Sequence, residues 1–229
     1  MVNIDTLLKI KEQNMTNKVS YMEECKARRE IVLWGKELYD RGLVNGSGGN
    51  LSIRLADDTV LFTPTGWFLG HLTEDMITKT DLEGNVLDGI KPTKEVPLHL
   101  AVYHTRVNVN AVVHSHSTYA TAFASMSAPG TKMPIYVPSV AAKVGNVIVT
   151  GFELPGTVAL GDNVRREIAN SNAVLLANHG VVAVGEDMQS AVSVASEVEG
   201  NAQLFFITNG KARTLAQADV ATLFKKLPF

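Results

Sequence analysis

The sequence predicts an α/β fold in which a mixed, mainly antiparallel sheet is covered by helices. Three observations predict it. Segments of strand and helix character alternate along the 229 residues. Several neighbouring strands are separated only by short turns, such as Asp57-Asp58 and Glu83-Gly84, whereas a doubly wound parallel sheet needs a long crossover between successive strands. Hydrophobic residues make up 45% of the chain, which is enough for a sizeable core without disulfides.

The first half of the chain is expected to contain two helices and two pairs of strands. A Ser-x-x-Glu capping box predicts where the first helix begins, and a proline predicts the start of the second. Between them, alternating apolar and polar residues predict the strands. In order, these elements are a helix from Ser20 to about Gly42, strands at 51–54 and 60–63, a hairpin over 76–88, and a helix from Pro97 to about Arg106.

The second half is expected to contain four strands and four helices. Runs of apolar and β-branched residues predict the strands, and apolar residues at helical spacing predict the helices. In order, we expect a strand from Ala111 into His114-Ser115-His116, a helix over 119–126 capped by Thr118, a strand at 146–150, a helix over 156–169, strands at 173–177 and 181–184, and helices over 188–207 and 215–226.

Composition excludes several classes of protein. The chain has 21 Lys and Arg against 23 Asp and Glu, with no basic block that would attract a nucleic acid. Its single cysteine, Cys25, cannot form an internal disulfide. No apolar run approaches the roughly 18 residues of a membrane span, and charges interrupt the first 18 residues too often for a signal peptide. We therefore expect a cytoplasmic protein with one domain over residues 1–229, including an N-terminal extension over 1–19.

Three histidines at the ends of apolar strands are candidate metal ligands. His114 and His116 alternate along one strand, so their imidazoles project from the same face about 7 Å apart along the chain. An isolated His-x-His pair is a weak signal, because two polar residues ending a strand give the same pattern. His179 also ends an apolar strand, where loops and binding sites gather. Three imidazoles that leave a coordination position open are typical of a catalytic zinc site.

Glu95 is the candidate proton carrier. It precedes Pro97 at the start of a predicted helix, where unpaired amide groups favour an anion. Most glutamates at such positions are only helix-start charges, and the sequence alone does not select this one. The remaining histidines, His71, His99 and His104, lack a comparable setting and are interpreted as surface or satisfied core residues.

Two glycine-containing loops are candidate anion sites. Gly46-Ser47-Gly48-Gly49-Asn50 and Thr63-Pro64-Thr65-Gly66 offer backbone amides and hydroxyls that can surround a phosphate. When each loop is considered alone, an ordinary turn is the more common explanation. Neither loop matches the P-loop or the dinucleotide fingerprint, so nucleotide binding is not supported.

Five segments together resemble the class II aldolase/adducin family, in the family's order and approximate spacing. The likeness extends from about Glu23 to Leu204. The segments are Gly49-Asn50-Leu51-Ser52, Thr63-Pro64-Thr65-Gly66, Pro92-Thr93-Lys94-Glu95, His114-Ser115-His116-Ser117 and Asn178-His179-Gly180.

The resemblance implies an α/β/α sandwich with a central, mainly antiparallel sheet, assembled as a homotetramer with sites between subunits. It implies Zn²⁺, or another divalent metal such as Mn²⁺ or Co²⁺, bound by His114, His116 and His179. Glu95 would move protons, and Tyr136 matches a tyrosine that a neighbouring subunit contributes as proton donor. The residues matching the family's sugar-phosphate pocket are Asn50, Thr65, Gly66, Thr93 and Lys94.

The family pattern leaves several reactions open. The leading one is cleavage of a small ketose phosphate by an aldolase-type lyase, giving dihydroxyacetone phosphate and an aldehyde through a metal-bound enediolate. The alternative is a 3-oxo-tetronate 4-phosphate decarboxylase, which Lys94 favours because aldolases usually have a hydroxyl residue there. A pentulose-5-phosphate 4-epimerase fits less well, since those members carry Asp at the position of Glu95. A non-catalytic adducin-like module would have lost the histidines that this chain retains.

Overall fold

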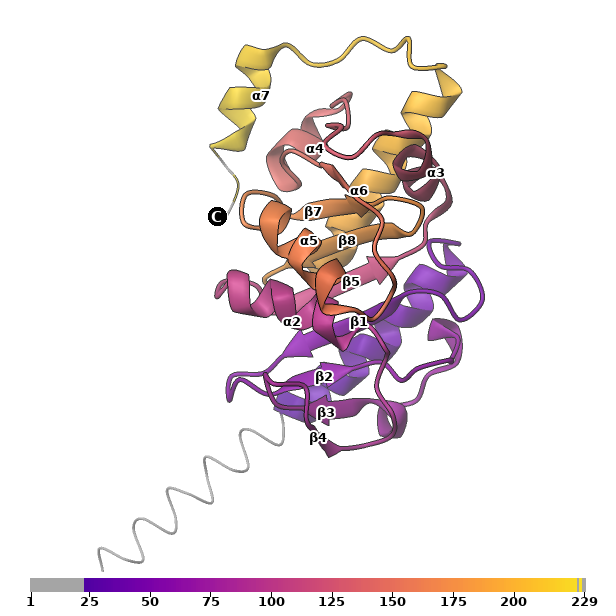
Figure 1. Cartoon of the computed structure of the whole chain (residues 1–229), viewed down its shortest axis with the longest axis vertical. Coiled ribbons are helices and arrows are strands. Elements are labelled where there is room, and N and C mark those ends of the chain that lie inside the picture. Colours follow the sequence, from indigo (N-terminus) through magenta and orange to yellow (C-terminus); the bar gives the residue numbers. More distant parts are fainter. Residues whose placement is uncertain (1–22, 226, 228–229) are drawn as a thin grey trace, which may run out of the picture.

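The computed structural model describes residues 23–225 and residue 227 (Figure 1). The predicted N-terminal extension and the Ser20 capping box lie outside these residues, as does the predicted end of the last helix at Lys226. Residues 23–40 are helical, which fits the predicted body of the first helix. No helix within the described ranges is both long and apolar enough to cross a membrane.

A single eight-stranded sheet runs through the middle of the protein. Its strand order is β4-β3-β2-β1-β5-β8-β7-β6, and all neighbours are antiparallel except β6 and β7. This confirms the predicted mixed, mainly antiparallel sheet. The strands are β1 (Asn50–Arg54), β2 (Val60–Phe62), β3 (Thr78–Thr80), β4 (Val86–Asp88), β5 (Ala111–Ser115), β6 (Val149–Thr150), β7 (Ala173–Leu176) and β8 (Gly180–Gly185).

Helices cover both faces of the sheet, giving three layers. One core contains α2 and α5 together with Val112 of β5, and the other contains helix 23–40, α3, α4 and α6 together with Val113. Successive strand residues point to opposite faces, so a strand buried on both sides is apolar throughout. The helices are α2 (Val96–Thr105), α3 (Thr118–Met126), α4 (Pro138–Lys143), α5 (Val158–Ile168), α6 (Met188–Ile207) and α7 (Gln217–Phe224), with short 3₁₀ turns at Leu69–His71 and Glu74–Met76.

Three details differ from the prediction. The cap of α3 is Ser117 rather than Thr118, and the Glu199 carboxylate accepts hydrogen bonds from the backbone N–H groups of Tyr119 and Ala120. The predicted strand at 146–150 is reduced to β6, and Ile148 just before it forms an isolated bridge with Lys132. Helix α4 was not predicted, since its six residues are too few to show a helical period.

Candidate metal centre

The structure brings the three predicted histidines to one place. His114 lies near the end of β5, His116 follows that strand, and His179 occupies the turn between β7 and β8. Because β8 pairs with β5, the turn lies beside the end of β5. The Nε2 atom of His114 is 3.2 Å from that of His179 and 3.0 Å from that of His116. Together with a carboxylate oxygen of Glu95, each residue offers a ligand atom, and all four atoms lie within 4.8 Å of one another.

Glycines allow the backbone to approach this cluster closely. A Cβ on Gly48 would lie 2.7 Å from Nδ1 of His116, and one on Gly180 would lie 3.0 Å from Cδ2 of the same ring. Gly49 has a positive φ of 81°, and its Cβ would meet the His114 carbonyl oxygen at 2.9 Å. The Gly48-Gly49 part of the loop predicted as an anion cradle also makes room for two of the histidines.

The protonation of His114 suits a metal ligand. Its Nδ1 lies 3.0 Å from the carbonyl oxygen of Val181, which can only accept, so Nδ1 carries the hydrogen and Nε2 presents a lone pair. Burial lowers the pKa of His114 to about 3 and also lowers the pKa of His116. Both rings are therefore neutral at pH 7, which is the form that binds metals. Nitrogen lone pairs gathered within hydrogen-bond distance fit a shared divalent cation.

Glu95 completes the cluster from the start of α2. Its carboxylate is 3% exposed. Oε2 lies 3.3 Å from Nε2 of His114 and accepts a 2.7 Å hydrogen bond from Nδ2 of Asn50. Oε1 lies 3.2 Å from Nε2 of His179 and has no hydrogen-bond partner among the described residues. Burial acts to raise the pKa of Glu95, but the two histidines and Asn50 outweigh it and lower the pKa below the ordinary range.

The predicted phosphate residues lie on two adjoining loops and one strand. A bridge between Pro64 and Pro92 joins the loops, and the N–H of Thr93 donates to the carbonyl of Thr63. The remaining residues differ in exposure. Thr93 is buried and its hydroxyl accepts from the N–H of Glu95, Thr65 is partly buried, Gly66 and Lys94 are exposed, and Asn50 is buried beside Glu95.

Tyr136 is separate from the four-residue cluster within the described chain. Its N–H donates to Oδ1 of Asn201 on α6, and no hydrogen bond or ring contact among the described residues joins it to the histidines. Partial burial raises its pKa. A role for Tyr136 in this chain's own site therefore has no support, and its predicted role in a neighbouring subunit's site stays a prediction.

Sequence reasoning missed a group of buried polar residues behind Glu95. His99 fits its interpretation as a satisfied core residue, but its partners are Asn50 and Ser52, and Ser52 also bonds to Tyr103. The signal was present as Glu95, His99 and Tyr103 at intervals of four, which places them on one face of a helix. His71 and His104 are exposed, as expected.

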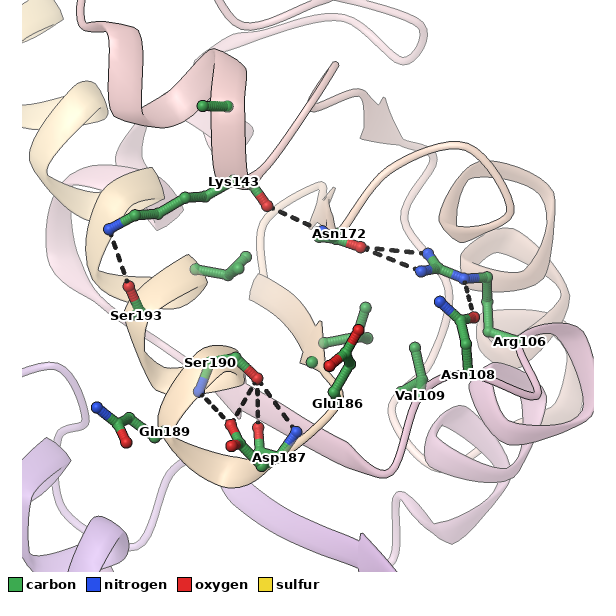
Figure 2. Close-up of a pocket in the computed structure, with 14 residues that line it drawn as sticks. Arg106, Asn108, Val109, Lys143, Asn172, Glu186, Asp187, Gln189, Ser190 and Ser193 are labelled. Carbon is green, nitrogen blue, oxygen red and sulfur yellow. Dashed lines mark hydrogen bonds between the residues drawn. The ribbon is translucent and has the colours of Figure 1, made fainter. Parts of the chain in front are cut away.

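A cavity of about 440 Å³ lies at the opposite end of the sheet (Figure 2). It is lined by Val109, just before β5, and by Gly185, which ends β8, whereas His114 and Gly180 lie at the other ends of the same strands. None of the predicted functional residues lines it. Figure 2 shows Arg106 bonded to Asn108 and Asn172, and Asp187 bonded to Ser190 at the start of α6.

A family model for the class II aldolase and adducin N-terminal domain matches residues 29–206. The chain belongs to the class II aldolase and adducin family. That membership agrees with the layered fold and with the Glu and three-His cluster, which can hold the metal on which such aldolases depend.

The relatives of this chain include both decarboxylases and aldolases. A 3-oxo-tetronate 4-phosphate decarboxylase of Pectobacterium atrosepticum is 38% identical over 93% of this chain and 99% of its own length. An L-fuculose phosphate aldolase of Methanococcus maripaludis is 40% identical over 79% of this chain and 96% of its own. The crystal structure of YgbL from Escherichia coli, described as a candidate aldolase/epimerase/decarboxylase, matches with a TM-score of 0.84 and 35% identity over 88% of this chain and 99% of that one. The relatives therefore share the family but differ in the reaction that they catalyse.

Proposed function

We propose that this protein is a metal-dependent decarboxylase of a 3-oxo-tetronate 4-phosphate. The observation that carries the proposal is Lys94, an exposed cation directly before Glu95 at the candidate metal centre. Burial is the main reason that the pKa of His116 is lowered, and the positive charge of Lys94 acts in the same direction. The four decarboxylases among the relatives, which are 36–38% identical over 87–93% of this chain, support the same choice.

The substrate class explains why a cation is useful there. A 3-oxo-tetronate 4-phosphate carries a carboxylate at one end and a phosphate at the other, and Lys94 can pair with either anion. Thr65, Gly66 and Thr93 are the proposed partners of the phosphate, whereas the side chain of Asn50, which was also predicted for this pocket, is bonded to Glu95 and His99. Backbone N–H groups and hydroxyls suit phosphate oxygens, and in the Thr65-Gly66 turn Gly66 is exposed and Thr65 is partly buried.

His114, His116 and His179 are the proposed ligands of a divalent cation, with zinc the first choice for three imidazoles and Mn²⁺ or Co²⁺ as alternatives. Such a cation withdraws electrons from a carbonyl and its adjacent hydroxyl, which stabilises negative charge on the neighbouring carbon. His114 holds a fixed position, because it is buried and its Nδ1 is bonded to the Val181 carbonyl, so its ring cannot rotate freely.

Glu95 is the proposed acid and base. When the bond between C1 and C2 breaks, carbon dioxide leaves and its electron pair stays with C2 and the C3 carbonyl as an enediolate. Glu95, whose carboxylate is ionised at rest, takes up a proton from water and delivers it to C2, which gives dihydroxyacetone phosphate. Oε1 is the oxygen assigned to this transfer, because Oε2 is already occupied by the hydrogen bond from Asn50.

Aldol cleavage is the second candidate, favoured by the L-fuculose phosphate aldolases that are 38–40% identical over 75–79% of this chain. In that reaction, the broken bond joins two hydroxyl-bearing carbons and an aldehyde leaves in place of carbon dioxide. The same enediolate remains, so the same Glu95 would protonate it. The two reactions therefore differ in the group that leaves.

The deciding experiment compares leaving groups. Purified, zinc-loaded protein is incubated with 3-oxo-tetronate 4-phosphate and, separately, with a panel of ketose 1-phosphates, and dihydroxyacetone phosphate, carbon dioxide and aldehyde are measured. We expect carbon dioxide and dihydroxyacetone phosphate in equal amounts from the sugar-acid phosphate. Aldehyde from a ketose 1-phosphate, without carbon dioxide release from the acid, would select the second candidate instead.

Lys94→Ser tests the residue that carries the proposal. Serine restores the hydroxyl usual in the aldolases but removes the positive charge. For the sugar-acid phosphate, we expect kcat/KM to fall by about tenfold to a hundredfold, as for the loss of one charge-assisted contact of about 1.5–3 kcal/mol. Lys91→Ser, which removes an exposed lysine three residues earlier, is the matched control. An unchanged kcat/KM in Lys94→Ser would remove Lys94 from substrate recognition.

A further inference from the structure

A continuous chain of buried hydrogen bonds leads from Glu95 away from the candidate metal centre. Asn50 Nδ2 lies 2.7 Å from Glu95 Oε2, and Asn50 Oδ1 lies 2.5 Å from Nε2 of His99. The Ser52 hydroxyl is then 2.7 Å from Nδ1 of His99 and 2.7 Å from the hydroxyl of Tyr103. All five side chains are at most 5% exposed, so water does not compete for these bonds.

Two regular elements place these residues opposite each other. Glu95 immediately precedes α2, and His99 and Tyr103 follow at intervals of four, which keeps all three on one helical face. Asn50 and Ser52 alternate on β1 and therefore share one face of the sheet. His114 of β5 lies directly beside Asn50 in the sheet register. The chain of bonds is thus built into the contact between α2 and the sheet.

The chemistry of the atoms fixes the direction of every bond. The ionised Glu95 carboxylate only accepts, so Asn50 presents its NH₂ group to it and its Oδ1 to His99. Since Oδ1 also only accepts, Nε2 of His99 carries the ring hydrogen. A neutral ring then has a lone pair on Nδ1, which receives the hydrogen of Ser52, and Ser52 in turn accepts from Tyr103. All the donors therefore point toward Glu95.

The opposite direction leaves a buried group unsatisfied. If every hydrogen bond in the chain were reversed, the Asn50 amide would be turned so that its oxygen faced Glu95. That arrangement suits only a protonated carboxyl. The hydrogens of His99 and Ser52 would then point away from Glu95, and the Tyr103 O–H would have no acceptor among the described residues. Unsatisfied buried hydroxyls are costly, so Tyr103 biases the whole chain toward donation at Glu95.

We propose that His99 is a positioning residue that, together with Ser52 and Tyr103, holds the Asn50 amide in the orientation that anchors Oε2 of Glu95. This inference rests on the proposed role of Glu95 in proton transfer. Anchoring one oxygen leaves Oε1 facing the cluster in a fixed position. Apart from Asn50, His99 makes no hydrogen bond or ring contact among the described residues with a proposed metal ligand or phosphate-binding residue, so its link to Glu95 runs through Asn50.

A pair of substitutions separates hydrogen bonding from packing. His99→Phe keeps an aromatic ring against Phe62 but removes the donor to Asn50, whereas His99→Gln retains an N–H at a similar position. In zinc-loaded protein, we expect His99→Phe to lower kcat by about a hundredfold, as displacement of a catalytic group does, with KM changed by less than about threefold. His99→Gln should recover most of this loss, and both variants should retain zinc. His104→Phe, on the exposed side of the same helix, is the matched control.

A spectroscopic measurement tests the proposal without relying on turnover. In ¹⁵N NMR spectra of the zinc-loaded protein with labelled histidine rings, signals absent from the His99→Gln spectrum belong to His99. We expect a protonated Nε2 and an unprotonated Nδ1. The reverse tautomer would overturn the proposal, as would wild-type kcat in His99→Phe or an equal loss in His99→Gln. If the protein turns over no substrate of the panel, the proposed function fails, and the tautomer of His99 is then the only test of this inference. The tautomer is also the deciding measurement if His99→Phe loses its zinc, because a lower kcat would then have another cause.

Discussion

Oε2 of Glu95 lies 3.3 Å from Nε2 of His114, but the two residues have different proposed roles, proton transfer and metal binding. Substitutions should distinguish these two roles. His114→Ala removes a ligand and should abolish both bound metal and activity while the fold remains. Glu95→Gln keeps a side chain of the same size and should retain metal but lose about a hundredfold to ten-thousandfold in turnover. Metal content by mass spectrometry and kcat are measured together. An active, metal-free His114→Ala protein would contradict the ligand assignment, and near-normal turnover in Glu95→Gln would exclude proton transfer by Glu95.

His99 should make stability depend on pH. Burial lowers its pKa to about 4, with nearby Glu95 acting in the opposite direction, while the unfolded chain has the ordinary value of 6.5. Between these values the unfolded chain binds a proton that the folded protein does not, so the free energy of unfolding falls as the pH is lowered. From pH 7.5 to 5.5 this amounts to about 1 kcal/mol.

Urea unfolding of the wild type and His99→Gln at both pH values measures that contribution. Other groups also titrate in this range, so the difference between the two proteins is the relevant quantity. His99→Gln should lose less stability on acidification than the wild type does. Equal losses would show that His99 does not titrate between the folded and unfolded states as described.

At the level of single residues, the sequence indicated the three histidines because strand alternation and strand ends are visible in it. It could not distinguish Glu95 from an ordinary helix-start charge, since its burial and its partner Asn50 depend on contacts 45 residues apart. The Gly48-Gly49 segment, predicted as part of an anion loop, also lies against His116. Its close approach to His116 is a tertiary contact that no local pattern encodes.

Among the helices, α3 depends on a distant carboxylate for its start. Glu199 of α6 accepts hydrogen bonds from two N–H groups in the first turn of α3, at 2.9 and 2.8 Å. These bonds satisfy unpaired donors and place a negative charge at the positive end of the α3 helix dipole. We expect Glu199→Ala to lower the free energy of unfolding by about 1 kcal/mol. Chemical denaturation measures this change, with the exposed Glu83→Ala as the control.

Glu199→Gln offers a finer comparison, because the amide oxygen can still accept but carries no charge. Its stability should lie between those of the wild type and Glu199→Ala. Equal stability of all three proteins would mean that the Glu199 side chain does not contribute to capping. The start of α3 follows His116 directly, so metal content is worth measuring in the same preparations.

The first and last residues of an element could be predicted where its pattern of apolar residues extended over many residues. Helix α6, with 20 residues, has the predicted bounds, whereas the strand expected at 146–150 shrank to two residues and α4 was missed. Long elements repeat their apolar period several times, but short ones depend on neighbours such as Lys132, which pairs with Ile148. The sheet was predicted correctly as mainly antiparallel because short turns restrict how neighbouring strands can pair.

For the whole molecule, Tyr136 allows a test of the expected homotetramer with shared sites. Variants His114→Ala and Tyr136→Phe should each be inactive or severely impaired. If a neighbouring subunit supplies Tyr136, then in randomly mixed assemblies of the two variants in equal amounts about a quarter of the sites should have both an intact His114 and an intact Tyr136. Activity should therefore reappear after the two variants are dissociated and reassembled together.

The control mixes His114→Ala with His179→Ala, whose defects fall in the same subunit's ligand set and cannot complement each other. Sedimentation of each preparation checks the assembly state. Absence of recovered activity in the first mixture, with tetramers present, would exclude Tyr136 from a shared site. A monomer in solution would exclude both the tetramer and the shared site.

The pairing of β5 with β8 has a consequence for how this gene can change. Register places His114 opposite Val182 and Ser115 opposite Val181, and each step along a strand reverses the face to which a side chain points. One extra codon within β5 ahead of His114 would thus turn that imidazole away from α2 and toward the other core. Insertions and deletions should be tolerated in surface connections such as 208–215. Within β5 and β8, only insertions or deletions of an even number of residues would keep each side chain on its present face of the sheet.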